Sequence, residues 1–125
     1  KNLDLRVQEA DLLLKQLAGL SILTNNIIVL GDFNSQVDER VHQDLKGKGF
    51  TNAMEEIGGG LHPTVDTAGK HGNAIDHIYL SPTLRKYLQS AIIFRGSGFR
   101  YDGPQKSGVW VNSDHLPVVV QLDWP

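Results

Sequence analysis

The sequence contains no cysteine, so it can form neither a disulfide framework nor a zinc site built on thiolates. It also lacks any apolar run near the roughly 20 residues that a membrane-spanning helix needs. Its 125 residues, 40% of them hydrophobic, predict one globular unit with a modest core, because so short a chain cannot form two domains. These absences leave the cellular compartment open.

The N-terminus shows neither an initiating methionine nor the charged, apolar and small-residue sections of a signal peptide. The chain begins with Lys1, so we expect a piece of a longer polypeptide. Any targeting signal of that parent would then lie outside this sequence.

The sequence also lacks a large excess of either charge: its formal net charge of -2 does not predict the basic surface typical of nucleic-acid-binding proteins. The distribution is nevertheless uneven. Residues 82–112 hold one acidic residue, Asp102, against five basic ones, which are Arg85, Lys86, Arg95, Arg100 and Lys106. The stretch 94–110 combines basic and aromatic residues that could stack bases and neutralise phosphates, or could form a solvated loop with its aromatics packed beneath. We expect Arg95 and Arg100 to bind substrate.

The hydrophobic pattern predicts an α/β protein. Apolar residues recur at helical spacing over residues 3–17, and the apolar run 27–30 is typical of a strand. Further helices are expected at about 38–46 and 83–89, and further strands at about 74–80, 91–94 and 118–122, while residues 50–57 could be helical or extended. Because the run 27–30 is apolar on both faces, we expect it in the interior of a sheet.

Three motifs each place an aspartate beside an apolar strand: GDFN at 31–34, AIDHIYLS at 74–81 and NSDHLPVVVQL at 112–122. A layered fold can deliver several such carboxylates to one rim. Taken alone, Gly31 and Asp32 could form only a turn, and Asp114 with His115 only a surface feature. Asp76 lies between apolar residues, so it needs a partner such as His115 if it is buried.

With these motifs in this order, the sequence resembles the endonuclease/exonuclease/phosphatase (DNase I-like) superfamily, aligned over nearly its whole length to the C-terminal half of that domain. The resemblance implies part of a four-layer α/β sandwich of mixed sheets flanked by helices, with residues 1–125 as a single unit that supplies one of the two sheets. The N-terminal half, with its glutamate metal ligand, is absent from this sequence. We therefore expect a weak or inactive catalyst unless a complementary chain restores that half.

The resemblance also implies a role for each motif residue. Asp32 would orient or deprotonate the attacking water, Asn34 would hold the phosphate or the metal, and Asp114 would join the metal site. His115 would contact a phosphate oxygen, with Asp76 bonded to its other ring nitrogen. Oxygen ligands of this kind suit Mg²⁺, with Mn²⁺ as an alternative. Whether Asp32 or His115 is the general base stays open.

The expected function is metal-dependent hydrolysis of a phosphodiester or other phosphoester, and the substrate could be a nucleic acid, a phospholipid or a nucleotide. The alternative is a non-catalytic truncated module that serves in binding or oligomerisation. A second copy could then cover the sheet face that the absent half would bury, since that face would otherwise be a large exposed apolar patch.

The other histidines carry no predicted chemistry. His77 alternates with Asp76, so it faces the opposite side of its strand and is expected to be structural. The spacing of His62, His71 and His77 matches no standard zinc pattern. His42 lies in a polar helix and is expected to be solvated.

Overall fold

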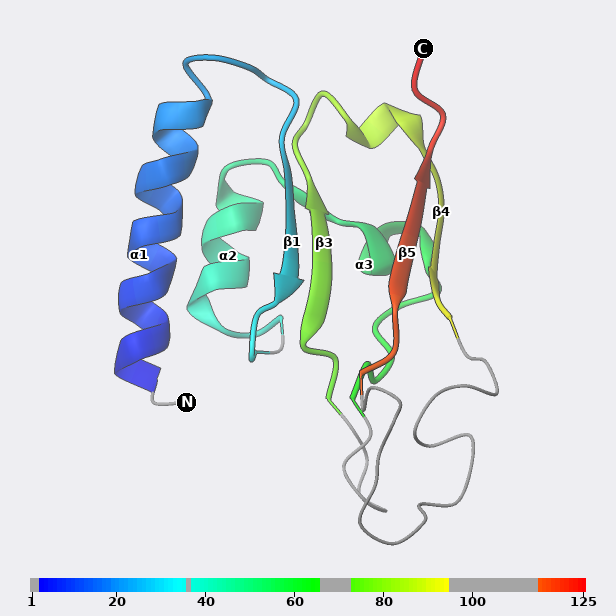
Figure 1. Cartoon of the computed structure of the whole chain (residues 1–125), viewed down its shortest axis with the longest axis horizontal. Coiled ribbons are helices and arrows are strands. Elements are labelled where there is room, and N and C mark those ends of the chain that lie inside the picture. Colours follow the sequence, from blue (N-terminus) through cyan, green and yellow to red (C-terminus); the bar gives the residue numbers. More distant parts are fainter. Residues whose placement is uncertain (1–2, 36, 66–72, 95–114) are drawn as a thin grey trace, which may run out of the picture.

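The computed structural model describes residues 3–35, 37–65, 73–94 and 115–125, which form the α/β architecture that the sequence predicts (Figure 1). Along the chain the elements are α1 (Leu3–Leu20), β1 (Ile28–Asp32), α2 (Arg40–Gly47), β2 (Thr51–Asn52), α3 (Ala53–Ile57), β3 (Asp76–Leu80), a 3-10 helix η1 (Arg85–Tyr87), β4 (Leu88–Ile93) and β5 (Val118–Leu122). No described helix combines the length and apolar character needed to cross a membrane.

Most predicted elements are present, with shifted ends. Residues 50–57, left open between two states, contain both: the short strand β2 and the helix α3, whose first N–H groups bond to the side chain of Asn52. The helix expected at 83–89 is only the short η1, because β4 already begins at Leu88 and pairs with β5 there.

The described strands form two hydrogen-bonded groups rather than the single sheet that was expected. β3 is the middle strand of an antiparallel sheet in the order β1-β3-β2, and β4 pairs antiparallel with β5. The segment entering β5 bonds elsewhere than to β3, because the N–H of Leu116 donates to the carbonyl of Thr64 and Pro117 has no N–H to donate. β3 and β5 thus lie side by side without a ladder between them (Figure 1).

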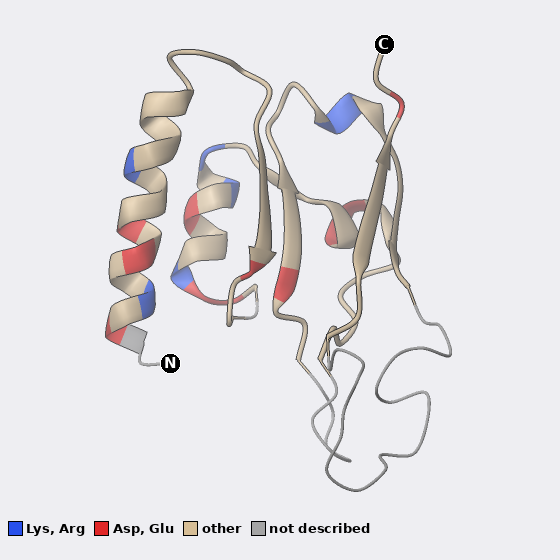
Figure 2. Cartoon of the chain, in the orientation of Figure 1, with Lys and Arg blue, Asp and Glu red and all other residues tan. Residues whose placement is uncertain are grey.

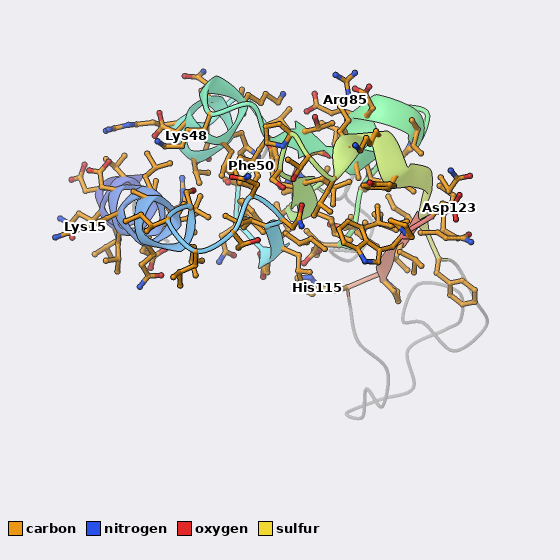
Figure 3. The ribbon with its side chains drawn as sticks, turned by 90° about the horizontal axis from the view of Figure 1, so that it is seen from above. Lys15, Lys48, Phe50, Arg85, His115 and Asp123 are labelled. Atoms are coloured by element: carbon orange, nitrogen blue, oxygen red, sulfur yellow. The ribbon has the colours of Figure 1, made fainter. Side chains whose placement is uncertain are left out.

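The core lies on one side of these strands. Leu17 of α1 and Leu45 of α2 pack with Phe50 and with Tyr79 of β3, and a second cluster joins Ala53 and Met54 of α3 to Ala91 of β4. Seen from above, α2 and α3 lie on the same side of the strands (Figure 3). One sheet face is therefore covered by helices.

The opposite face of β1 is open, which corrects the expectation that this strand is buried on both faces. Ile28 is 45% exposed and Leu30 66% exposed, whereas Val29 packs against the core. Among the described strands, β1 pairs with β3 only, so it is an edge strand. The apolar run correctly predicted a strand, but only one of its two apolar faces finds a partner within the described residues.

Candidate active site

Two aspartates from distant motifs face each other on the open side of the sheet. Asp32 ends β1, Asp76 begins β3, and the antiparallel register pairs them directly. Paired residues point to the same face, which here is the face of Ile28 and Leu30. Figure 2 shows the acidic ends of β1 and β3 side by side. Sheet pairing alone thus joins the first two motifs.

His115 completes the group from the third motif. One ligand atom from each of Asp32, Asp76 and His115 lies within 4.8 Å of the others. The Nδ1 atom of His115 lies 2.9 Å and 3.1 Å from the two carboxylate oxygens of Asp76. An Nδ1–H that donates to this carboxylate fixes the orientation of the ring. The predicted pairing of Asp76 with His115 is therefore confirmed.

Thr64 binds the backbone at Asp76 and beside His115, and no sequence pattern marked it. Its buried hydroxyl accepts hydrogen bonds from the N–H groups of Ile75 and Asp76, both at 3.1 Å. Its carbonyl accepts the N–H of Leu116, next to His115, and Val65 forms an isolated bridge with His115. Because these contacts span the loop between the motifs, no local pattern could have predicted them.

The GDFN segment forms a tight turn that presents two exposed polar side chains. Asp32 Oδ1 accepts the backbone N–H of Asn34 at 2.8 Å, and Asn34 has a left-handed backbone with φ of 50°. Asparagine tolerates this conformation better than most residues. The turn interpretation therefore holds, and the turn that Asp32 stabilises places both side chains at the rim.

A layer of buried polar rings lies beneath this turn. His42 is fully buried, which corrects the expectation that it is solvated: its Nδ1 atom lies 2.5 Å from the hydroxyl of Tyr79 and its Nε2 atom 3.0 Å from Ser35 Oγ. The reason is that His42 shares the inward face of α2 with Leu45, three residues later. His77 points to this side as predicted, with its Nε2 atom 3.1 Å from the carbonyl oxygen of Ser35.

Burial controls the protonation of these rings. Loss of water, and then the neighbouring His77, lower the pKa of His42 from 6.5 to about 4. Burial likewise lowers the pKa of His77 and raises the pKa of Tyr79 to about 12. All three rings are therefore uncharged at neutral pH.

The residues present fit a hard divalent cation. Asp32 and Asp76 supply carboxylate oxygens at one rim, with the exposed carboxamide of Asn34 two residues from Asp32. A cleft of about 210 Å³ beside them is lined by Leu30, both aspartates, Ile78 and residues 116–118. The remaining predicted site residues, Asp114, Arg95 and Arg100, lie outside the described residues, as does His71.

Comparisons with known proteins identify the family. The model of the Endonuclease/Exonuclease/phosphatase family matches residues 2–115, so the chain belongs to this family. No curated protein sequence matches the chain significantly.

Solved structures show the same fold. The 3′-5′ exonuclease NExo from Neisseria meningitidis superposes with a TM-score of 0.70 at 22% identity, and the match covers 94% of this chain and 53% of that one. The 3′ phosphatase NExo from Neisseria, bound to a product DNA hairpin, gives 0.71 at 21% identity, covering 94% and 52%. The chain therefore spans about half the length of these structures, within the DNase I-like fold.

Proposed function

We propose that this chain supplies Asp32, Asn34, Asp76 and His115 to the active site of a metal-dependent phosphoester hydrolase. The observation that carries the proposal is the convergence of Asp32, Asp76 and His115, which are separated by up to 83 positions in the chain yet have ligand atoms within 4.8 Å. Family membership makes hydrolysis of phosphoesters the chemistry to expect of such a group.

In the proposed mechanism the chain's own groups orient the substrate and move a proton. Asp32 and Asn34, with Asp114, would hold Mg²⁺ or Mn²⁺, which when bound supplies charge stabilisation for the phosphoryl oxygens. His115, held by Asp76, would contact a non-bridging phosphate oxygen through its Nε2 atom. Asp32 or His115 would accept the proton of the attacking water, and the assignment stays open between them.

The open sheet face indicates that the site needs a second half. Ile28 and Leu30 on β1, and Ile92 and Val119 on the β4–β5 pair, are between 45% and 66% exposed. Each of these side chains points away from the helix-covered core. Together with the half-length match to the solved structures, this favours a complementary chain or segment that covers the face and completes the catalytic residues.

Among phosphoesters, we propose nucleic acid as the first substrate class to examine. The support is the fold shared with an exonuclease and a 3′ phosphatase whose structure holds a DNA hairpin. Phospholipid and nucleotide phosphoesters belong in the same panel, because the charge of the described site distinguishes none of these substrates.

The test compares the purified chain with the chain completed by its N-terminal half. A 3′-phosphorylated DNA hairpin, a short DNA duplex, a phospholipid and a nucleotide are incubated with Mg²⁺ or Mn²⁺, and released products are measured. We expect little or no turnover by the chain alone and clear turnover by the completed enzyme. Asp76→Asn should abolish most of it, while replacing the exposed His62 by Gln should leave it unchanged.

Two results would overturn the proposal in different ways. Magnesium-dependent hydrolysis by the 125-residue chain alone, lost on Asp114→Ala, would show that the second half is not needed. A completed protein that hydrolyses no phosphoester would instead support the alternative, a non-catalytic module that uses its open face for binding or self-association. Light scattering, with a fluorescent dye for apolar surface, would then show whether two copies cover that face.

A further inference from the structure

Two consecutive residues of β3 contact two different parts of the candidate site, His115 and the turn that carries Asp32 and Asn34. Asp76 points to the open face, where it binds His115, and His77 points to the buried face, where it binds the carbonyl of Ser35. Ser35 directly follows the segment that carries Asp32 and Asn34. One short stretch of strand thus contacts both the histidine and the metal-binding turn.

The turn is held from the buried side by four contacts. The ring of Phe33 stacks on that of His42, with centroids 5.2 Å apart, and lies edge-on to that of His77 at 5.4 Å. The Ser35 hydroxyl lies 3.0 Å from His42 Nε2, and the Ser35 carbonyl oxygen lies 3.1 Å from His77 Nε2. Phe33 and Ser35 flank Asn34, so their contacts restrain its left-handed backbone from both sides.

The hydrogen bonds of His77 allow a single arrangement of its protons. A carbonyl can only accept, so His77 Nε2 carries the hydrogen that is donated to Ser35. The other nitrogen, Nδ1, lies 3.1 Å from the side-chain nitrogen of Asn52, whose oxygen already accepts two N–H groups of α3. Asn52 therefore donates to Nδ1. Through this chain of bonds, α3 orients His77, and His77 orients the turn.

We propose that His77 is a positioning residue for the candidate active site, which holds Asp32 and Asn34 in their ligand-binding geometry through Ser35. This inference rests on the proposed function, because it assigns the turn a ligand. Asp32 and Asn34 are themselves exposed, so the contacts that restrain the turn come largely from the partly buried Phe33 and the buried Ser35. Loss of the Ser35 bond would allow the turn to fluctuate while the strand ladder of β1 and β3 persists.

A purely structural role predicts a different result. If His77 only fills space, an apolar ring of similar size should serve as well. If it positions the turn, what matters is a donor at Nε2. The side-chain nitrogen of glutamine can reach a similar place, so His77→Gln should rescue what His77→Phe loses.

The experiment uses the 125-residue chain and Mn²⁺ alone, with affinity measured by electron paramagnetic resonance of free Mn²⁺. We expect His77→Phe to weaken Mn²⁺ binding by about tenfold or more, as is usual when the outer partner of a ligand-bearing group is removed. His77→Gln should stay within about threefold of the original chain on the same basis. Two controls should bind as the original chain does: His62→Gln, an exposed histidine, and Leu17→Ala, which loosens the core.

Nuclear magnetic resonance gives an independent readout without metal. The ring ¹⁵N shifts of His77 should show the Nε2–H tautomer, and the amide signals of Asp32 and Asn34 should shift or broaden in His77→Phe but not in His77→Gln or Leu17→Ala. Unchanged turn signals and unchanged Mn²⁺ affinity in folded His77→Phe would overturn the inference.

The two proposals fail in distinguishable ways. If the original chain binds no Mn²⁺, metal binding by this chain fails, and the turn signals alone decide the role of His77. If the chain binds Mn²⁺ and Leu17→Ala weakens binding as much as His77→Phe does, the effect is one of general stability and the positioning role is wrong.

Discussion

Histidines lie on both faces of β3, but the one on the open face and those on the buried face have different surroundings. On the open face, Asp76 and His115 pair at a rim, next to the exposed Asp32. On the buried face, His77 and His42 are enclosed and uncharged, and both nitrogens of each ring have partners. The role of a histidine therefore depends on its burial and on its hydrogen-bond partners. His115 at the rim can contact a ligand, whereas His42 and His77 in the buried layer hold neighbouring segments in place.

The largest effect is expected from replacing His115 on the open face. If a second half completes the proposed hydrolase, His115→Ala in that protein should lower kcat by about 10²- to 10⁴-fold, the usual range for a positioned acid or base. The free energy of unfolding should change little, because the side chain of His115 is 35% exposed. Steady-state kinetics and urea unfolding of the same sample test both statements, and a kcat within threefold of the original would remove His115 from the mechanism.

The next largest difference is expected between two leucines, Leu45 of α2 in the core and Leu30 on the open face of β1. Leu45→Ala removes a fully buried side chain and should lower the free energy of unfolding by about 2–5 kcal/mol. Leu30→Ala, at a site that is 66% exposed, should change it by less than about 0.5 kcal/mol in the chain alone. Urea unfolding of the two variants measures the contrast. Equal losses would mean that the face of Leu30 is already covered, for example by a second copy.

The buried histidines should make the stability of the protein depend on pH. Because the pKa of His42 is lowered to about 4 in the folded protein, the unfolded chain takes up protons first as the pH falls below 6.5. The free energy of unfolding should therefore decrease between pH 6.5 and about 4, by at most about 3 kcal/mol from this residue. The lowered pKa of His77 acts in the same direction.

Urea unfolding at pH 7.5 and pH 5.0 measures this decrease. His42→Gln should be less stable at pH 7.5 but should lose less stability on acidification, whereas His62→Gln should lose as much as the original chain. An identical pH response of His42→Gln and the original would show that His42 does not titrate as a buried neutral group.

The smallest expected effect concerns apolar surface. Leu30→Thr should change the free energy of unfolding by less than about 0.5 kcal/mol, yet it should reduce the fluorescence of a dye that binds exposed apolar patches. Val29→Thr is the matched change on the covered face, and it should destabilise without reducing dye binding. Dye fluorescence that Leu30→Thr leaves unchanged would place the patch elsewhere.

Sequence patterns predicted the types of most elements and the pairing of Asp76 with His115. The alternation of side chains along a strand predicted that Asp76 and His77 point to opposite faces of β3. The resemblance to the family predicted that Asp76 meets His115. The burial of His42 could not be predicted, because its partner Tyr79 lies 37 positions away and the composition of α2 is polar. Nor could a run of apolar residues in β1 show that its outer face is exposed within the described residues.

The roles of Asp114, Arg95 and Arg100 stay predictions, since these residues lie outside the described part of the chain. Thr64 and Ser35 were missed for a different reason. Both act mainly through backbone or hydroxyl contacts with residues from other motifs, and single serines and threonines carry no periodic signal that would mark them.

The left-handed backbone at Asn34 restricts which residues can replace it. Glycine accepts this conformation without strain and asparagine or aspartate tolerate it, whereas alanine is opposed by its Cβ atom. Asn34→Gly would therefore preserve the shape of the turn while deleting the carboxamide, and Asn34→Ala would disturb both. Position 34 thus offers a way to separate architecture from ligand chemistry with a single pair of substitutions.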